Sequence, residues 1–135
     1  MKKDIDFGLV EGISVAVASS PDELGAPTWN VYLINNNPHP LTNVLIASTG
    51  YGTMDDGTEV KTSTLRHMFE QVEAKSFVQI EPIDPGIFHL NNEYWVSYYV
   101  DNNIYDKKFI FVPDSITEDN LIEISMLQMQ GILHS

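Results

Sequence analysis

Short runs of β-forming residues recur along the chain, and this pattern limits the possible folds more than any other feature. The runs are rich in Val, Ile, Thr, Tyr and Phe, and Gly, Pro, Asn or Asp interrupts them at short intervals. Consecutive runs of this kind are typical of antiparallel strands joined by turns. The pattern therefore predicts an all-β protein with few helices.

Seven runs have the length and composition of strands, and the last two form the clearest β-hairpin. In that hairpin, alternating aromatic and β-branched residues flank a short polar turn at 101–103. Seven strands in 135 residues favour a two-sheet antiparallel sandwich, immunoglobulin-like or fibronectin-like, with a barrel as the main alternative. The predicted strands cover residues 13–17, 28–34, 43–49, 60–69, 76–80, 94–100 and 104–112.

The segment after Pro113 has a different pattern. Ser115-Ile116-Thr117-Glu118 fits a capping box, in which Ser and a Glu three residues later cap the start of a helix. We expect a short C-terminal helix running into an extended tail. A chain of this length corresponds to one domain, so we expect a single β-sandwich domain over residues 1–135.

The charge of the chain limits the class of partner. The chain carries 7 Lys and Arg against 19 Asp and Glu, a formal net charge of −12, and residues 4–60 contain no Lys or Arg. Nucleic acids and anionic membranes attract proteins mainly through Lys and Arg. We therefore expect neither as a partner. The absence of Cys excludes disulfides and thiolate metal sites.

The first residues give little indication of export. Lys2 and Lys3 are followed at once by acidic residues, and no apolar segment develops after them. A secretory signal needs an apolar region of about 7–15 residues, and a membrane-spanning helix needs about 20. We expect a cytoplasmic protein.

Recognised catalytic and cofactor-binding motifs are lacking. Gly50-Tyr51-Gly52 is not followed by the Lys and Ser or Thr of a phosphate-binding loop, and no Ser lies in a nucleophile elbow. Asp55-Asp56-Gly57-Thr58-Glu59 offers three carboxylates to a cation such as calcium, but its residues are also those of an ordinary turn. We expect no cofactor and no resident metal.

His67 is the histidine of most interest, because the neighbouring cation Arg66 favours the neutral imidazole. The four histidines, His39, His67, His89 and His134, are far apart in the sequence, and none has the spacing of a metal-ligand pair. Arg66, His67 and nearby carboxylates give the alternative hypothesis of small-ligand binding or a metal-assisted enzyme.

Aromatic residues in the predicted hairpin suggest a recognition surface, since Tyr and Trp are enriched at protein interfaces. Tyr94 and Tyr98 share one face of their strand and Trp95 and Tyr99 the other, so only one pair belongs to the inner layer. Tyr94 follows Leu90 at a spacing similar to a tyrosine corner, and Trp29 is expected in the core. The candidate surface residues are Tyr94, Trp95, Tyr98, Tyr99 and Tyr105.

These features favour a noncatalytic module for protein interaction or structure, with an unknown protein partner or a second copy of the chain bound at the aromatic hairpin or an open sheet edge. The surface of the folded protein distinguishes an interaction module from a ligand-binding enzyme. An exposed aromatic patch supports the first, and a concave pocket with converging polar groups supports the second.

Four strand-like runs carry a resemblance to a known family: Trp29–Asn35, Ser63–His67, Leu90–Glu93 and Lys107–Val112. The chain resembles a family of small uncharacterised bacterial proteins, some of which bear the label phenylalanyl-tRNA synthetase subunit. The runs are scaffold segments, so the resemblance assigns no functional residue. We expect no synthetase activity, because a chain with a single Arg lacks the arginines of an adenylate site and its acidic surface repels tRNA.

Overall fold

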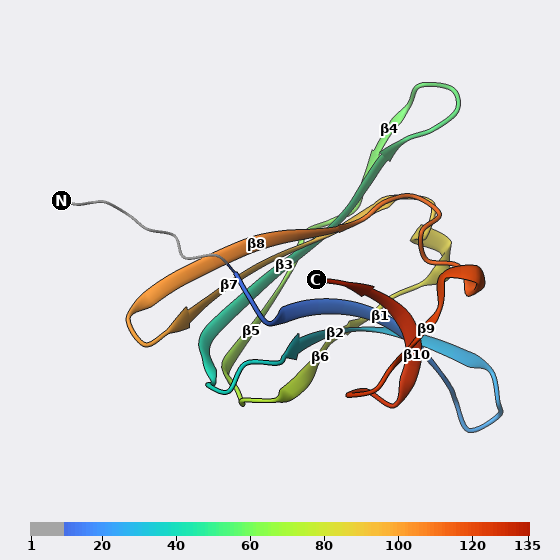
Figure 1. Ribbon diagram of the computed structural model, residues 1–135. Coiled ribbons are helices and arrows are strands. Elements are labelled where there is room, and N and C mark those ends of the chain that lie inside the picture. Colours follow the sequence, from blue (N-terminus) through green and yellow to red (C-terminus); the bar gives the residue numbers. More distant parts are fainter. Residues whose placement is uncertain (1–9) are drawn as a thin grey trace.

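The computed structural model describes residues 10–135, which contain ten strands and two short 3-10 helices (Figure 1). The prediction about a secretory signal falls on residues 1–9, which lie outside the described residues. The strands form two open antiparallel sheets. The predicted all-β, two-sheet sandwich is confirmed, and the barrel alternative is wrong. In residues 10–135, no helix has the length and apolar character required to span a membrane.

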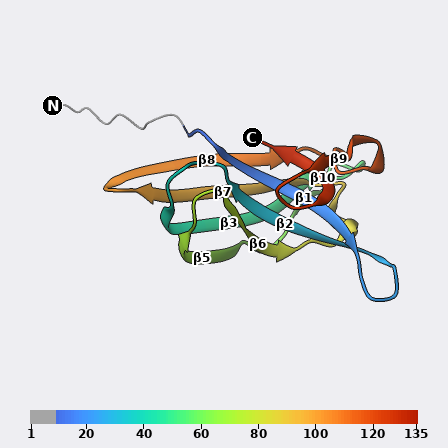
Figure 2. The ribbon, with the colours of Figure 1, turned by 60° about the horizontal axis from the view of Figure 1, so that its bottom comes forward.

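Sheet A has the strand order β6-β2-β1-β10-β9, and sheet B has the order β4-β3-β7-β8 with β5 also paired to β3. Figure 2 shows β8, β7, β3 and β5 following one another in sheet B. The strands of sheet A are β1 (Ile13–Pro21), β2 (Pro27–Asn35), β6 (Ser76–Pro82), β9 (Ile122–Ile124) and β10 (Met129–His134). The strands of sheet B are β3 (Leu41–Thr53), β4 (Glu59–Lys61), β5 (Leu65–Val72), β7 (Asn91–Val100) and β8 (Asn103–Phe111).

The predicted strand 60–69 is two strands, and both pair with the long strand β3. The break falls at residues 62–64, where the Thr62 hydroxyl oxygen accepts a hydrogen bond from the Gly50 amide at 2.8 Å. The hydroxyl also donates to the Ser63 carbonyl at 3.0 Å. A side chain therefore replaces part of the backbone ladder here, which ends β4 before β5 begins.

The main core lies between the sheets and follows the two-residue alternation of the strands. Val15 and Val17 of β1, for example, face Ile46 and Val96 of sheet B, and all four are buried. Trp29 packs at the margin of this core, with its ring perpendicular to that of Phe88 at 5.3 Å between centroids. It is half-buried rather than enclosed.

A second, smaller core covers the outer face of sheet A. Ala16 and Ala18 of β1 are buried there, because Ile124 and Leu127 from β9 and the following turn pack against them. Small alanine side chains on the outer face of β1 let this C-terminal segment approach closely. β10 then pairs along β1, with Val15 opposite His134.

The C-terminal segment is extended, with one turn of 3-10 helix. That helix, η2 (Glu118–Asn120), has Thr117 as its N-cap and no side-chain cap bond. The predicted capping box does not form, because the Ser115 hydroxyl donates to the Val112 carbonyl at 2.7 Å instead. The predicted extended tail is strands β9 and β10. The other 3-10 helix, η1 (Pro85–Ile87), joins β6 to β7 and is capped by Asp84.

Candidate functional site

The aromatic residues of the β7–β8 hairpin divide between the core and the surface. Tyr94 and Tyr98 are only 2% and 3% exposed, so the prediction that they belong to a contact surface is wrong. Trp95 and Tyr99 lie on the opposite face and are 44% and 36% exposed. Tyr105 is half-buried and stacks on Tyr98 at 5.4 Å between ring centroids. The alternation of β7 sends the aromatic pairs to opposite faces.

The exposed pair belongs to a larger apolar patch on the outer face of sheet B, which we call the Trp95 face. Strand register pairs four of its members: Leu45 of β3 lies opposite Met68 of β5, and Tyr99 lies opposite Ile104 of β8. Directly opposed residues in an antiparallel pair point to the same side of the sheet. The Trp95 face consists of Leu45, Met68, Trp95, Tyr99 and Ile104, all exposed.

Cations flank the tryptophan on this face. The Lys108 ammonium lies 4.7 Å from the centroid of the Trp95 ring, in a cation–π contact. Ala47 of β3 pairs with both Trp95 and Arg66, so the two side chains share the outer face on either side of Ala47. Arg66 therefore belongs to the Trp95 face, and the predicted cooperation of Arg66 with His67 is wrong because adjacent residues of β5 point to opposite sides.

The Trp95 face is close to electrically neutral, unlike the rest of the molecule. Arg66 and Lys108 are accompanied there by Glu70, Glu93 and Asp106, as register and strand alternation show. The whole chain has a formal net charge of −12. An approaching acidic protein meets less repulsion at the Trp95 face than at the average surface.

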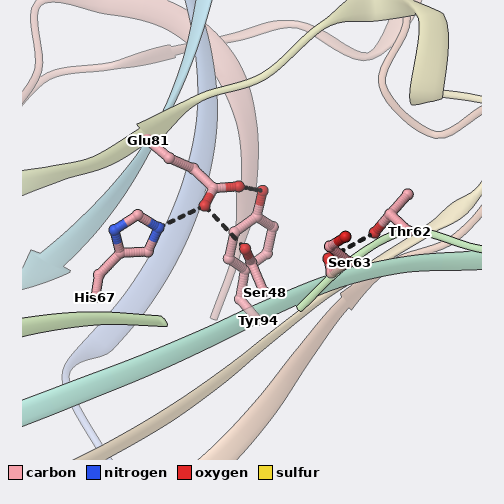
Figure 3. A network of polar contacts seen from close by, with 6 residues as sticks. All are labelled: Ser48, Thr62, Ser63, His67, Glu81 and Tyr94. Atoms are coloured by element: carbon pink, nitrogen blue, oxygen red, sulfur yellow. Dashed lines mark hydrogen bonds and ion pairs between the residues drawn. The ribbon is translucent and has the colours of Figure 1, made fainter. Parts of the chain in front are cut away.

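His67 points inward, into a polar cluster centred on the Glu81 carboxylate (Figure 3). Its Nε2 lies 2.7 Å from Glu81 Oε1, and the Ser48 hydroxyl donates to the same oxygen at 2.8 Å. The Tyr94 hydroxyl donates to Oε2 at 3.1 Å. Glu81 comes from β6 of sheet A, whereas its three partners come from β5, β3 and β7 of sheet B. We call these four residues the Glu81 cluster.

The Glu81 cluster is shielded from solvent, with the Glu81 side chain only 11% exposed. Burial, together with the negative charge of Glu81 and the hydrogen bond to it, raises the pKa of Tyr94 far above the ordinary value for a phenol. Tyr94 therefore stays a neutral donor. A buried carboxylate is costly unless donors surround it, and here three donors do so while joining the two sheets.

A β-bulge gives Glu81 its inward direction. Val31 of β2 pairs with Glu81 and the next residue, Tyr32, pairs with Gln79, so Ile80 is the extra residue. Strict alternation places Ile80 inside and Glu81 outside, but the bulge turns both side chains toward the core. The position of Tyr94 also differs from a tyrosine corner, because its hydroxyl bonds the Glu81 carboxylate rather than the backbone.

A cavity of about 240 Å³ adjoins the Glu81 cluster. It forms because the inward-facing residues of β3 become smaller along the strand, from Val44 and Ile46 to Ser48, Gly50 and Gly52. Leu65, Ile83 and Ile87 provide apolar walls, and Glu81, Asp84 and Asn92 provide oxygen atoms. The cavity thus has the apolar lining and few polar groups of a small-ligand site.

The cluster contains no Ser–His pair and no metal site. The Ser48 hydroxyl donates to the Glu81 carboxylate rather than to the His67 imidazole. Within residues 10–135, no group of three or more His, Asp or Glu is placed to hold a metal ion. The carboxylates of the 55–59 turn are exposed. A hydrogen bond with the Thr58 side chain, together with the one that Asp56 Oδ1 accepts from the Thr58 amide at 2.9 Å, lowers the pKa of Asp56.

The remaining histidines lie apart from the cluster. His39 lies in the β2–β3 connection, and His89 follows η1; both are exposed. The ring of His134 packs edge-on against Phe109 and Phe111 at the end of β10. None of the three joins His67.

No family model, curated protein or solved structure matches the chain. The resemblance to small bacterial proteins stays a prediction. The functional interpretation of the Trp95 face and the Glu81 cluster therefore depends on their geometry alone.

Proposed function

We propose that the protein is a noncatalytic interaction module that self-associates through the Trp95 face. The observation that carries the proposal is an exposed tryptophan, flanked by Lys108 and Arg66, on a sheet face that also exposes Leu45, Met68, Tyr99 and Ile104. Aromatic residues and Arg are enriched at interfaces, and large exposed apolar patches rimmed by polar residues mark contact sites.

The mixed charge of the Trp95 face supports a second copy of the chain as the partner. In a two-fold symmetric contact the same surface is used by both copies. Arg66 and Lys108 of one copy can then meet Glu70, Glu93 and Asp106 of the other. Two surfaces with the average charge of this −12 chain repel each other, whereas two near-neutral faces do not.

Sedimentation velocity over a range of protein concentrations tests this proposal. We expect the wild-type protein to form dimers, and Tyr99→Ser or Met68→Ser to shift the equilibrium toward monomers. Ile122→Ser is the matched control, since Ile122 is similarly exposed on β9 of the other sheet. A wild-type protein that stays monomeric, or a control that dissociates the dimer equally, contradicts the proposal.

The formal net charge of −12 supports the proposal that nucleic acids and anionic membranes are not partners, because both carry negative charge. Retention of the protein on heparin at moderate ionic strength contradicts it.

A further inference from the structure

We propose that the cavity beside the Glu81 cluster binds a primary alkylammonium group. The cavity lies between the sheets, on the opposite side of sheet B from the Trp95 face, and the proposal is independent of self-association. It rests on three features: unsatisfied oxygen acceptors, a negative charge that is already fixed in place, and apolar walls.

Asn92 offers the first acceptor. It is only 3% exposed, and its Nδ2 donates to the Ile87 and Leu90 carbonyls at 3.0 and 3.2 Å. These bonds fix the orientation of the amide, while Oδ1 accepts no hydrogen bond from the described residues. Every fully enclosed side-chain oxygen or nitrogen in this part of the chain has a partner, so Asn92 Oδ1 is open to the space that Asn92 lines. An unpaired amide oxygen in such a site favours a donor.

Glu81 and Asp84 supply the charge. Glu81 Oε2 accepts one hydrogen bond, from Tyr94, and a carboxylate oxygen can accept two. The Ser48, His67 and Tyr94 contacts fix the orientation of the Glu81 carboxylate. The second acceptor position of Oε2 is therefore already oriented, and little ordering is needed when a ligand binds. Asp84 also lines the cavity, where one of its oxygens accepts from the Gly86 amide at 2.8 Å.

The apolar walls and the floor of the cavity favour an alkyl chain attached to the ammonium group. Leu65, Ile83 and Ile87 line the cavity and match a short chain of methylene groups. Gly50 keeps the floor open: a Cβ at this position would lie 3.5 Å from Asn92 Oδ1 and 3.2 Å from the Thr62 methyl group. An ammonium head has three donors and no acceptor, which complements the carboxylates and the amide oxygen. An anion of the same size meets two carboxylates and is repelled.

Amide chemical shifts measured during titration with n-butylammonium test the proposal. We expect saturable shifts at Gly50, Ser63 and Asn92. Butanol and butyrate have similar size without the positive charge, and we expect neither to cause these shifts at the same concentrations. Equal shifts from butanol overturn the proposal, because they indicate apolar contact alone, and an absence of saturable shifts with n-butylammonium overturns it as well.

Two variants test the acceptors. We expect Asp84→Asn to weaken n-butylammonium binding severalfold and Glu81→Gln to weaken it by about tenfold or more. Asp55→Asn removes the same charge from the remote 55–59 turn and is expected to leave binding unchanged. If Glu81→Gln does not fold, Leu65→Trp replaces it as the test, because a larger side chain at the partly exposed Leu65 fills the cavity. The proposal is overturned if Asp84→Asn and the second variant, Glu81→Gln or Leu65→Trp, both bind n-butylammonium with wild-type affinity.

An alkylammonium group can come from a free amine or from a lysine side chain in a peptide. Titration with 1,4-diaminobutane and with a lysine residue blocked at both ends distinguishes these sources. Tighter binding of the blocked lysine than of n-butylammonium assigns the cavity to a peptide side chain, and tighter binding of the diamine assigns it to a free amine.

Discussion

Replacing Tyr94 with Phe removes one hydroxyl group from the junction between the sheets. In the wild-type protein that hydroxyl donates to Glu81 Oε2 at 3.1 Å, and Tyr94 is 2% exposed. A hydrogen bond to a charged group contributes about 1.5–3 kcal/mol, and Tyr94→Phe leaves Glu81 Oε2 without this donor. We expect Tyr94→Phe to lower the free energy of unfolding by about 2 kcal/mol.

Tyr98→Phe is the matched control. Tyr98 lies four residues along the same strand and is similarly buried, but its hydroxyl makes no hydrogen bond within residues 10–135. Urea denaturation should therefore show a midpoint lowered by about 1 M for Tyr94→Phe and nearly unchanged for Tyr98→Phe, if the slope is about 2 kcal/mol per M. Equal effects of the two substitutions would refute the view that the Glu81 cluster joins the sheets.

Three further predictions concern other parts of the fold. Burial, with a smaller contribution from Tyr105, raises the pKa of Tyr98 from 10.0 to about 12. Because the neutral phenol is favoured in the folded protein, this contribution to the free energy of unfolding is complete below pH 10 and is lost as the pH rises from about 10 to about 12. Urea denaturation at a series of pH values should show a smaller decrease in the free energy of unfolding for Tyr98→Phe than for the wild type. Gly131→Ala should lower the free energy of unfolding by about 1–3 kcal/mol in urea denaturation, because the new Cβ meets the Val17 carbonyl oxygen at 2.5 Å. Millimolar calcium should leave the melting temperature unchanged, since the 55–59 turn is closed by its own hydrogen bonds; a rise would reveal a cation site there.

Strand alternation and turn residues predict most of this fold, because these signals are local. The hairpin of β7 and β8 follows from aromatic and β-branched residues on either side of the 101–103 turn. Strand β10 is less visible, because it is specified by pairing with β1, far away in the sequence. Strands β4 and β9 pair locally, with β3 and β10, but each has only three residues, too few to show an alternating pattern. The expected capping box fails for a local reason, because the Ser115 hydroxyl donates to the Val112 carbonyl, three residues earlier.

The Glu81 cluster is beyond this kind of prediction. Strict alternation in the predicted strand 76–80 continues to an outward-facing Glu81, and only the bulge at Ile80 turns it inward. The sequence singles out His67 but associates it with Arg66, which the alternation of β5 sends to the other side. One available signal is the run of small residues on one face of β3, Ser48, Gly50 and Gly52. Small residues at inward positions indicate a space that other side chains must fill or leave open.

The pairing of β1 with β10 has a consequence for the order of events during synthesis. Strands β1 and β2 leave the ribosome early. The second edge of β1 pairs with β10, where Val15 lies opposite His134, so this edge remains unpaired until β10 has been made. Until then the alanine side of β1 and its unpaired backbone groups are open to strands of other chains. Slow folding and early aggregation are common when contacts span such sequence separations. The edge of β1 that pairs with β10 therefore stays unpaired until the residues of β10 have been synthesised.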